Sequence, residues 1–212
     1  FVTSNSAIEG TMAQLAARLD RWLRSVGEKG LVVARERGIV LIIESKTPAA
    51  GQRLAKRMES EIPNLPQALM IGLSYLHPAD KSLRRSYEEA VEAAEIGLRL
   101  RLNPPVVSFA ELGLLDWIYL LPPETMRRNP YLAKIEALAE HDSRTNSELL
   151  HTLNAYLESG GALAEAAAGI NVHRNTLLYR LGRIEDIVKV DLREFKQRLN
   201  LYVALKSYLL KR

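Results

Sequence analysis

The sequence predicts an α+β domain followed by an all-α domain that contains a helix-turn-helix, and three observations lead to this fold class. Residues 1–110 alternate helical spacings of apolar residues with short β-branched runs. Residues 111–146 carry apolar stretches separated by prolines, and residues 147–212 show helical spacing throughout. We therefore expect three parts: the α+β domain over 1–110, a helical connector over 111–146 and the helix-turn-helix domain over 147–212.

The composition is that of a globular protein without thiol chemistry. The chain has 212 residues, of which 47% are hydrophobic and 25% charged, and none is cysteine. Structural disulfides, thiolate metal sites and cysteine nucleophiles are therefore excluded. No apolar run approaches the ~20 residues of a membrane helix, so we expect a cytoplasmic protein with no membrane partner. The net charge of +4 and the pI near 9.3 favour a polyanionic partner.

The predicted α+β domain has the element order α-β-β-α-β-α-β around an antiparallel or mixed sheet. Helical spacing predicts a helix over 12–26, and two β-branched runs around a Gly-containing break predict a β-hairpin over 31–34 and 39–43. The remaining elements are a helix over 50–61, a strand over 68–74, a helix over 81–102 and a strand over 106–109. In the long helix we expect Asp80 as the N-cap residue. The expected apolar face of that helix comprises Leu83, Tyr87, Val91, Ala94 and Leu98.

The connector is expected to contain two helices and a linker. An apolar stretch over 112–121 ends at two prolines, and Pro130 opens a second helix that runs to about Glu140. The polar run over 141–146 is the predicted linker. We expect Trp117 and Tyr119 of the apolar stretch to pack in the core of the chain, and packing between domains or between protomers is the alternative.

Residues 147–212 predict a helix-turn-helix. A helix over 147–158 ends at two glycines, an Ala-rich helix over 163–168 follows, and a longer helix runs from 173 to 188. Small residues let two helices cross closely, as a helix-turn-helix requires. In the turn between the last two helices, Asn171 is expected to adopt a positive φ. The core-facing residues of the last helix are expected to be Leu177, Leu181, Ile184 and Val188.

The opposite face of the last helix is basic and carries no acidic residue before Glu185. A recognition helix presents its N-terminal side chains to base edges in the major groove, where Arg pairs with guanine and Asn with adenine. Thr, Tyr and further Arg residues suit phosphates. We therefore predict contacts with double-stranded DNA by His173, Arg174, Asn175, Thr176, Tyr179, Arg180 and Arg183. The alternatives are a basic helix face without a target and a surface that binds another protein.

The run VHRNTLLYRL over 172–181 closely resembles the C-terminal domain of PucR/CdaR-type transcriptional regulators, as do 149–157 and 198–205. The resemblance implies a Fis-like helix-turn-helix that binds operator DNA as a homodimer or higher homo-oligomer. It further implies a regulator of a catabolic operon with a small-molecule effector. Because the chain starts at Phe1 rather than at methionine, we expect a fragment, with the sensing region either upstream or in a pocket that the sequence does not reveal. The sequence departs from the family over 168–171, where such proteins more often carry bulkier apolar residues.

Three upstream stretches, 71–74, 83–90 and 107–115, resemble the GGDEF-like middle domain of the same regulators. True GGDEF domains are diguanylate cyclases whose hairpin turn supplies glycines for the nucleotide and acidic residues for metal. The corresponding turn here, RERGI over 35–39, has one acidic residue and no paired glycines, whereas metal-assisted phosphoryl transfer needs carboxylate ligands. We therefore predict a degenerate GGDEF-like domain for dimerisation or effector sensing, and no enzyme activity. The alternative is a nucleotide-binding or cyclic-dinucleotide-responsive signalling protein.

Other residues that could support catalysis form no recognisable motif. The four histidines, His77, His141, His151 and His173, are not paired at metal-ligand spacing. We expect His77 to be solvated and His151 to be either satisfied within the fold or exposed. The acidic stripe of Glu88, Glu89, Glu92 and Glu95 is expected to be a solvated helix face. We therefore expect no catalytic residue, no metal site and no cofactor.

Overall fold

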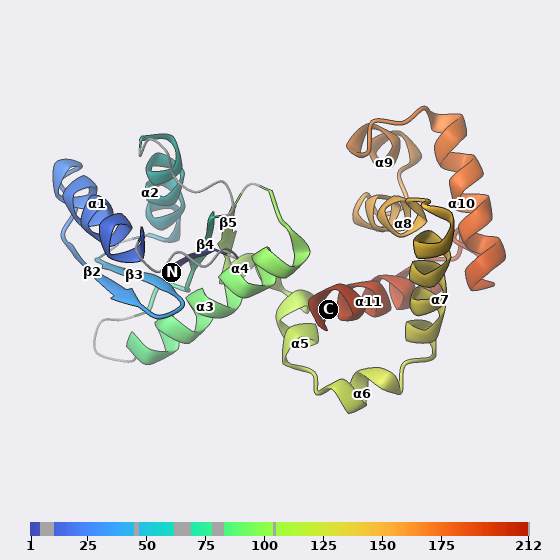
Figure 1. Cartoon of the computed structure of the whole chain (residues 1–212), viewed down its shortest axis with the longest axis horizontal. Helices are drawn as coiled ribbons and strands as arrows, with labels where there is room; N and C mark the ends of the chain where they lie inside the picture. Colours follow the sequence, from blue (N-terminus) through green and yellow to red (C-terminus); the bar gives the residue numbers. More distant parts are fainter. Residues whose placement is uncertain (5–10, 45–46, 62–68, 78–82, 104, 212) are drawn as a thin grey trace. The chain divides into compact units, whose positions relative to one another are not determined.

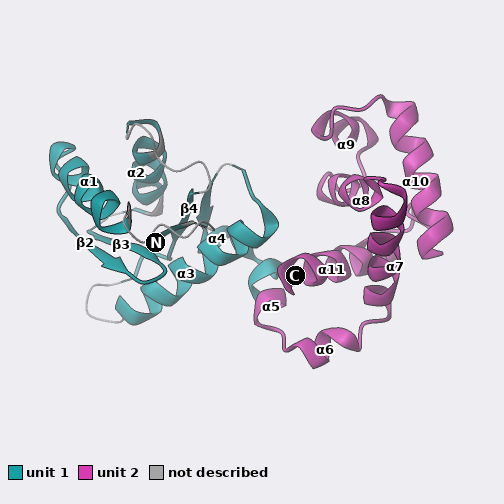
Figure 2. Ribbon diagram, viewed as in Figure 1, with its two compact units in different colours: residues 1–117 teal, residues 118–212 magenta. Residues whose placement is uncertain are grey.

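The computed structural model describes residues 1–4, 11–44, 47–61, 69–77, 83–103 and 105–211, and it divides the chain into two compact units. Unit 1 is Phe1–Trp117 and unit 2 is Ile118–Arg212 (Figure 2). The expected connector over 111–146 is therefore shared between the two units. Among the described helices, none combines the length and apolar character needed to cross a membrane.

Unit 1 is built on a mixed five-stranded sheet in the order β2-β3-β1-β4-β5. The strands are β1 (Val2–Ser4), β2 (Gly30–Arg35), β3 (Gly38–Ile43), β4 (Leu69–Leu73) and β5 (Val106–Ser108). β4 and β5 are parallel and the other neighbours are antiparallel, so the predicted β-hairpin and mixed sheet are confirmed. The sequence did not predict β1, because its three residues include one apolar side chain and no apolar run, unlike Val106 and Val107 of β5.

Helices cover both faces of this sheet (Figure 1). On one face lie α1 (Thr11–Ser25) and α2 (Pro48–Glu61), and on the other lies α3 (Leu83–Leu100). The core beneath α1 and α2 is mostly aliphatic and also contains Trp22, and alternate strand residues point toward these helices. Its most deeply buried members include Leu15, Leu19, Leu23, Ile39, Met58 and Ile71.

The buried face of α3 differs from the predicted one. Leu83 is 60% exposed and Tyr87 is 40% exposed, so these two residues do not belong to the core. Ala94 is buried as predicted, and the buried positions are mostly small: Glu89, Ala90, Ala93, Ala94, Ile96 and Gly97. A Cβ atom on Gly97 would lie 2.7 Å from the Met70 sulfur, and small residues therefore allow α3 to approach the sheet closely. The predicted N-cap Asp80 lies outside the described residues.

Four helices occupy the stretch that was expected to be the connector. They are α4 (Phe109–Leu112), α5 (Leu114–Leu120), α6 (Pro123–Arg127) and α7 (Pro130–Thr145). The expected core packing of Trp117 is wrong, because this side chain is 72% exposed. The predicted linker over 141–146 is also wrong, since α7 continues through it to Thr145. The Asp142 carboxylate of α7 accepts the backbone N–H groups of Leu149 (3.0 Å) and Leu150 (2.8 Å), so this polar run caps the next helix.

Unit 2 is helical in its described part. After α7 follow α8 (Leu149–Glu158), α9 (Leu163–Gly169), α10 (Arg174–Val188) and α11 (Phe195–Lys211), close to the predicted bounds. Gly160 and Gly161 end α8 with positive φ values of 64° and 93°, a conformation that suits glycine. The deepest core residues are contributed by four of these helices: Ile135, Leu138, Leu153, Leu177, Ile184 and Leu201.

We predict that Gly72→Ala destabilises unit 1. A Cβ atom on Gly72 would overlap the carbonyl oxygen of Ala90 and lie 2.7 Å from the Ala94 nitrogen, so α3 would have to move off the sheet. Overpacking of this kind costs about 1–3 kcal/mol. Both tryptophans, Trp22 and Trp117, lie in unit 1, so urea unfolding followed by tryptophan fluorescence reports on this unit. Gly51→Ala is the control, because that Cβ would meet no atom within 4 Å; equal midpoints for the two variants would contradict the prediction.

Candidate nucleic-acid interface

The two helices α9 and α10 form the helix-turn-helix, and their turn has the conformation that the sequence predicts. Asn171 adopts a φ of 53°, and the Val172 N–H donates to the carbonyl of Ala167 over 3.0 Å. Ala166 and Ala167 are buried, which allows close packing of α9. The unusual residues over 168–171 are therefore compatible with a compact turn.

The inner face of α10 fixes how the helix is rotated about its axis. Leu177, Leu181, Ile184 and Val188 are all buried, as predicted, and α10 packs against α7, α8 and α9. The last turn is also held, because Lys134 of α7 donates from Nζ to the Val188 carbonyl over 2.6 Å. A cation at a helix C-terminus interacts favourably with the helix dipole. The opposite face is thereby directed to solvent.

His173 is the N-cap residue of α10. Its backbone is extended, and its Nδ1 atom accepts the backbone N–H of Asn175 over 3.2 Å. The imidazole thus satisfies one of the unpaired donors of the first turn, a role more often taken by Ser, Thr, Asp or Asn. The ring remains exposed to solvent.

Most of the predicted DNA-contacting residues lie on the outer side of α10. Arg174, Asn175 and Thr176 are exposed in its first turn. Tyr179, which is 67% exposed, and Arg183 follow along the same helix. Together with His173, they bring guanidinium, amide, hydroxyl and imidazole groups to the first three turns of one helix, which suits hydrogen bonding to base edges and phosphates.

Arg180 is placed differently from its neighbours. Its side chain is 24% exposed, and its guanidinium lies 3.4 Å from Glu148 and donates to the Thr152 hydroxyl over 3.2 Å. Glu148 is the N-cap residue of α8 and Thr152 lies in α8, so the Arg180 side chain points toward α8 rather than toward solvent. Helical spacing could have indicated this, because Arg180 precedes the core residue Leu181 by one position and follows Leu177 by three.

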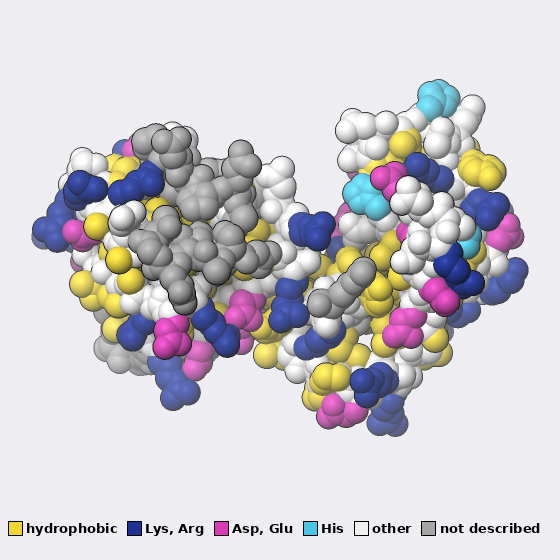
Figure 3. Space-filling view, viewed as in Figure 1, with side chains coloured by type: hydrophobic (Ala, Val, Ile, Leu, Met, Phe, Trp, Pro, Cys, Tyr) yellow, Lys and Arg dark blue, Asp and Glu magenta, His cyan; other side chains and the backbone are white. Residues whose placement is uncertain are grey.

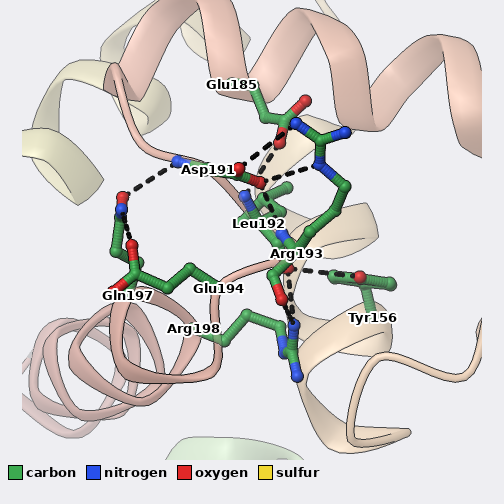
Figure 4. Close-up of polar contacts among 8 residues, drawn as sticks. All are labelled: Tyr156, Glu185, Asp191, Leu192, Arg193, Glu194, Gln197 and Arg198. Atoms are coloured by element: carbon green, nitrogen blue, oxygen red, sulfur yellow. Dashed lines mark hydrogen bonds and ion pairs between the residues drawn. The ribbon is translucent and has the colours of Figure 1, made fainter.

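The loop between α10 and α11 is held by polar contacts that sequence reasoning missed (Figure 4). The buried Leu192 lies at its centre. Its N–H donates to Glu185 over 2.8 Å, and its carbonyl accepts from Arg198 over 2.8 Å and from the Tyr156 hydroxyl over 3.4 Å. The backbone N–H and C=O of this one residue thus link α10, α8 and α11. No spacing in the sequence reveals these contacts, because they join side chains to the backbone of a loop.

Arg193 of the same loop forms an exposed ion pair. Its guanidinium bonds Asp191 over 3.1 Å and 3.2 Å, and this contact lowers the pKa of the Asp191 carboxyl (Figure 4). Arg193 is therefore a weaker candidate for a phosphate contact than Arg183. On the face drawn in Figure 3, lysine and arginine side chains are scattered over unit 2 among acidic and hydrophobic ones. The geometry of α10, rather than bulk charge, marks the candidate interface.

Two sequence-based predictions in unit 1 are wrong. His77 was expected to be solvated and Glu89 to belong to a solvated acidic stripe. Instead, the Glu89 side chain is buried, and its carboxylate lies 2.7 Å from His77 Nε2 and accepts from the Tyr75 N–H and the Arg85 Nε over 3.0 Å each. Glu89 therefore fastens the segment after β4 to α3. The sequence could not show this, since its partners come from two separate elements.

The β-hairpin turn between β2 and β3 packs closely against the start of the chain. A Cβ atom on Gly38 would overlap the carbonyl oxygen of Val2 and lie 2.7 Å from the Phe1 ring, so this glycine admits β1. The Thr3 hydroxyl donates to the Arg37 carbonyl over 2.6 Å. Within the described ranges, no group of three or more His, Asp or Glu residues is arranged to hold a metal ion.

We predict that Glu92→Gln stabilises unit 1 at neutral pH. Burial raises the pKa of Glu92, and the nearby Asp116 carboxyl raises it further. Burial also raises the pKa of Asp116. A raised carboxyl pKa means that the folded state holds its proton more tightly than the unfolded state, so stability falls as pH rises through the folded-state pKa.

The melting temperature of Glu92→Gln should therefore exceed that of the wild type at pH 7, and the difference should shrink toward pH 4. Thermal unfolding followed by tryptophan fluorescence at several pH values measures this. Glu36→Gln, at an exposed turn position, is the control. A pH-independent difference for Glu92→Gln would contradict the raised pKa of Glu92 beside Asp116.

Two family models match the chain. The PucR C-terminal helix-turn-helix domain matches residues 149–207, which contain α8, α9 and α10. The GGDEF-like domain matches residues 4–96 of unit 1.

Three curated relatives come from Bacillus subtilis (strain 168). The DNA-binding transcriptional activator AdeR is 29% identical over 123 residues, covering 58% of this chain and 29% of AdeR. The purine catabolism regulatory protein is 31% identical over 121 residues, covering 57% of this chain and 22% of that protein. The proline-responsive transcriptional activator PutR is 29% identical over 188 residues, covering 82% of this chain and 44% of PutR.

The aligned part covers less than half the length of each of these relatives. The crystal structure of a regulator of polyketide synthase expression from Bifidobacterium adolescentis aligns with 100% of this chain and 85% of that chain, at 18% identity and a TM-score of 0.33. A TM-score this low supports no conclusion about the arrangement of the chain.

Proposed function

Because this chain is of the PucR/CdaR type, with a GGDEF-like domain followed by a PucR C-terminal helix-turn-helix domain, we propose that it regulates transcription by reading double-stranded DNA with α10. One observation carries this proposal. The apolar face of α10 is buried, while the side chains of its first turn, Arg174, Asn175 and Thr176, extend into solvent. Such a role requires access to the chromosome, so we infer a cytoplasmic protein.

We assign the contacts by side-chain chemistry. Arg174 and Asn175 lie at the N-terminal end of α10, which enters the major groove deepest, and they are suited to guanine and adenine edges. His173 lies beside them at the cap. Thr176, Tyr179 and Arg183 are suited to phosphates along the groove. Arg180 contacts a phosphate only if its guanidinium exchanges Glu148 for the DNA.

We further propose that the protein acts on a catabolic operon as a homodimer or higher homo-oligomer. One helix-turn-helix reads one half-site, and a second copy doubles the contacts and fixes their spacing. The names of two relatives, a purine catabolism regulator and a proline-responsive activator, support a small-molecule effector from a catabolic route.

The GGDEF-like domain is proposed to be catalytically inactive and to serve dimerisation or effector sensing. The supporting observation is the hairpin turn between β2 and β3, where Arg35 and Arg37 flank the single acidic residue Glu36. Gly38 is needed there for the contact with β1 rather than for a nucleotide. Two arginines are poor neighbours for divalent metal ions, although they would tolerate an anion.

We predict that Arg174→Ala and Asn175→Ala each weaken DNA binding and change the base preference. Loss of a bidentate contact with a base costs about 1–3 kcal/mol. Arg183→Ala should weaken binding to all sequences more evenly and lower the slope of log K against log salt by about 1. Selection of duplexes from a random-sequence pool, followed by fluorescence anisotropy, measures both effects.

Lys56→Ala is the control for these variants, because Lys56 is an exposed cation of α2 in unit 1. Circular dichroism checks that each variant remains folded. If all three α10 variants shift DNA binding no more than the control does, the assignment of α10 as the recognition helix is wrong.

We predict no turnover of guanine nucleotides by the GGDEF-like domain. The full chain is incubated with radiolabelled GTP and Mg²⁺, and the products are separated by thin-layer chromatography. The label should remain in GTP at the level of a protein-free sample. Formation of a cyclic dinucleotide would overturn the proposed inactivity while leaving the DNA-binding proposal intact.

A further inference from the structure

Gly182 lies in the middle of α10, where no contact among the described residues requires a glycine. It stands between the buried Leu181 and the exposed Arg183, more than one turn from either end of the helix. A Cβ atom built there would meet no atom within 4 Å. Glycine inside a helix is less stable than alanine because it loses more backbone entropy on folding. The fold therefore carries a cost at this position that packing does not require.

Other helical glycines of the described residues differ in this respect. Gly97 of α3 is required by packing, since its Cβ would lie 2.7 Å from Met70 and 2.8 Å from Val107. Gly51 lies in the first turn of α2, and Gly169 is the last residue of α9, where a glycine disturbs the helix less. In the described part of the chain, Gly182 thus combines an interior helix position with open space around its missing side chain.

The position of Gly182 on the helix is informative. It follows Asn175 by seven residues, which is about two turns, so the two residues lie on the same side of α10. It follows Tyr179 by three residues and directly precedes Arg183. At Gly182 the backbone of α10 is therefore not covered by a side chain, and this bare strip lies beside Asn175 and Tyr179, to which we assign DNA contacts. The exposed Asp186, four residues further on, ends this strip because a carboxylate repels phosphates.

Resting on the proposed function, we infer that Gly182 is a DNA-contact position, at which the sugar–phosphate backbone of one strand comes against the α10 backbone. Glycine is the residue that permits close approach of a helix to a ligand. The N-terminal side chains of a recognition helix reach the bases, and later turns pass the wall of the groove, where the phosphates lie. Arg183, the next residue, lies about 100° further around the helix, and its long side chain can bring a positive charge to a phosphate at this strip. A methyl group at 182 would hold the strand away from both Arg183 and the helix.

The test uses two variants of the full chain, Gly182→Ala and Gly182→Leu, and a duplex selected from a random-sequence pool by the wild-type protein. Both replacements improve helix propensity, and the added Cβ atom meets no atom within 4 Å. Unfolding of unit 2 is the part of the far-UV circular dichroism transition that the tryptophan fluorescence of unit 1 does not report, and its melting temperature should rise by about 4 °C or more. DNA affinity should fall on the order of tenfold for alanine, a contact of about 1.4 kcal/mol, and further for leucine. Opposite changes in stability and affinity are not expected of a merely structural glycine.

Gly51→Ala is the matched control, because it also fills open space on a helix but lies in unit 1. It should leave DNA affinity unchanged. If the Gly182 variants bind the selected duplex within twofold of the wild type, the inference is wrong and the proposed function stands. If the wild-type protein enriches no duplex at all, the proposed function itself fails.

Discussion

The burial of four aliphatic side chains on one side of α10 is the interaction on which the rest of unit 2 depends. Leu177, Leu181, Ile184 and Val188 are held against the neighbouring helices, so α10 cannot rotate without exposing them. Burying a side chain of this size contributes roughly 1.5–3 kcal/mol. Polar contacts complete the arrangement at both ends: His173 caps the start and Lys134 the end. A helix fixed in this way can present a defined set of side chains to a rigid partner such as DNA.

The sequence predicted secondary structure well wherever the spacing of apolar residues follows the period of a helix or a strand. The hairpin of β2 and β3, the helices α8, α9 and α10, and the positive φ of Asn171 all follow from residue types that are close together in the sequence. Most of the candidate interface was predictable too, because the residues opposite a buried helical stripe are exposed. Arg180 is the exception, since its partners Glu148 and Thr152 belong to another helix. Contacts of that kind depend on tertiary packing, which spacing does not encode.

Unit 1 shows a different limit of sequence reasoning. The expected face of α3 included Leu83 and Tyr87, which are exposed, and the helix approaches the sheet through alanines and Gly97. Hydrophobicity measures how much a side chain gains from burial, whereas the distance between layers decides whether it fits. Gly72 on the strand and small residues on the helix are two halves of one close contact, and they are far apart in sequence. Similarly, the buried Glu89 and the partly exposed His77 form a pair, although each resembles an ordinary surface residue in the sequence.

The cap at His173 also determines which nitrogen of its ring bears the hydrogen. Because Nδ1 accepts the Asn175 N–H, the neutral imidazole bears its hydrogen on Nε2 and offers solvent a donor only. In the proposed complex, this ring can meet N7 of either purine, O6 of guanine, O4 of thymine or a phosphate oxygen, but not the amino group of cytosine. In that proposed complex, the residue that starts the helix would favour a hydrogen-bond acceptor on the base beside it.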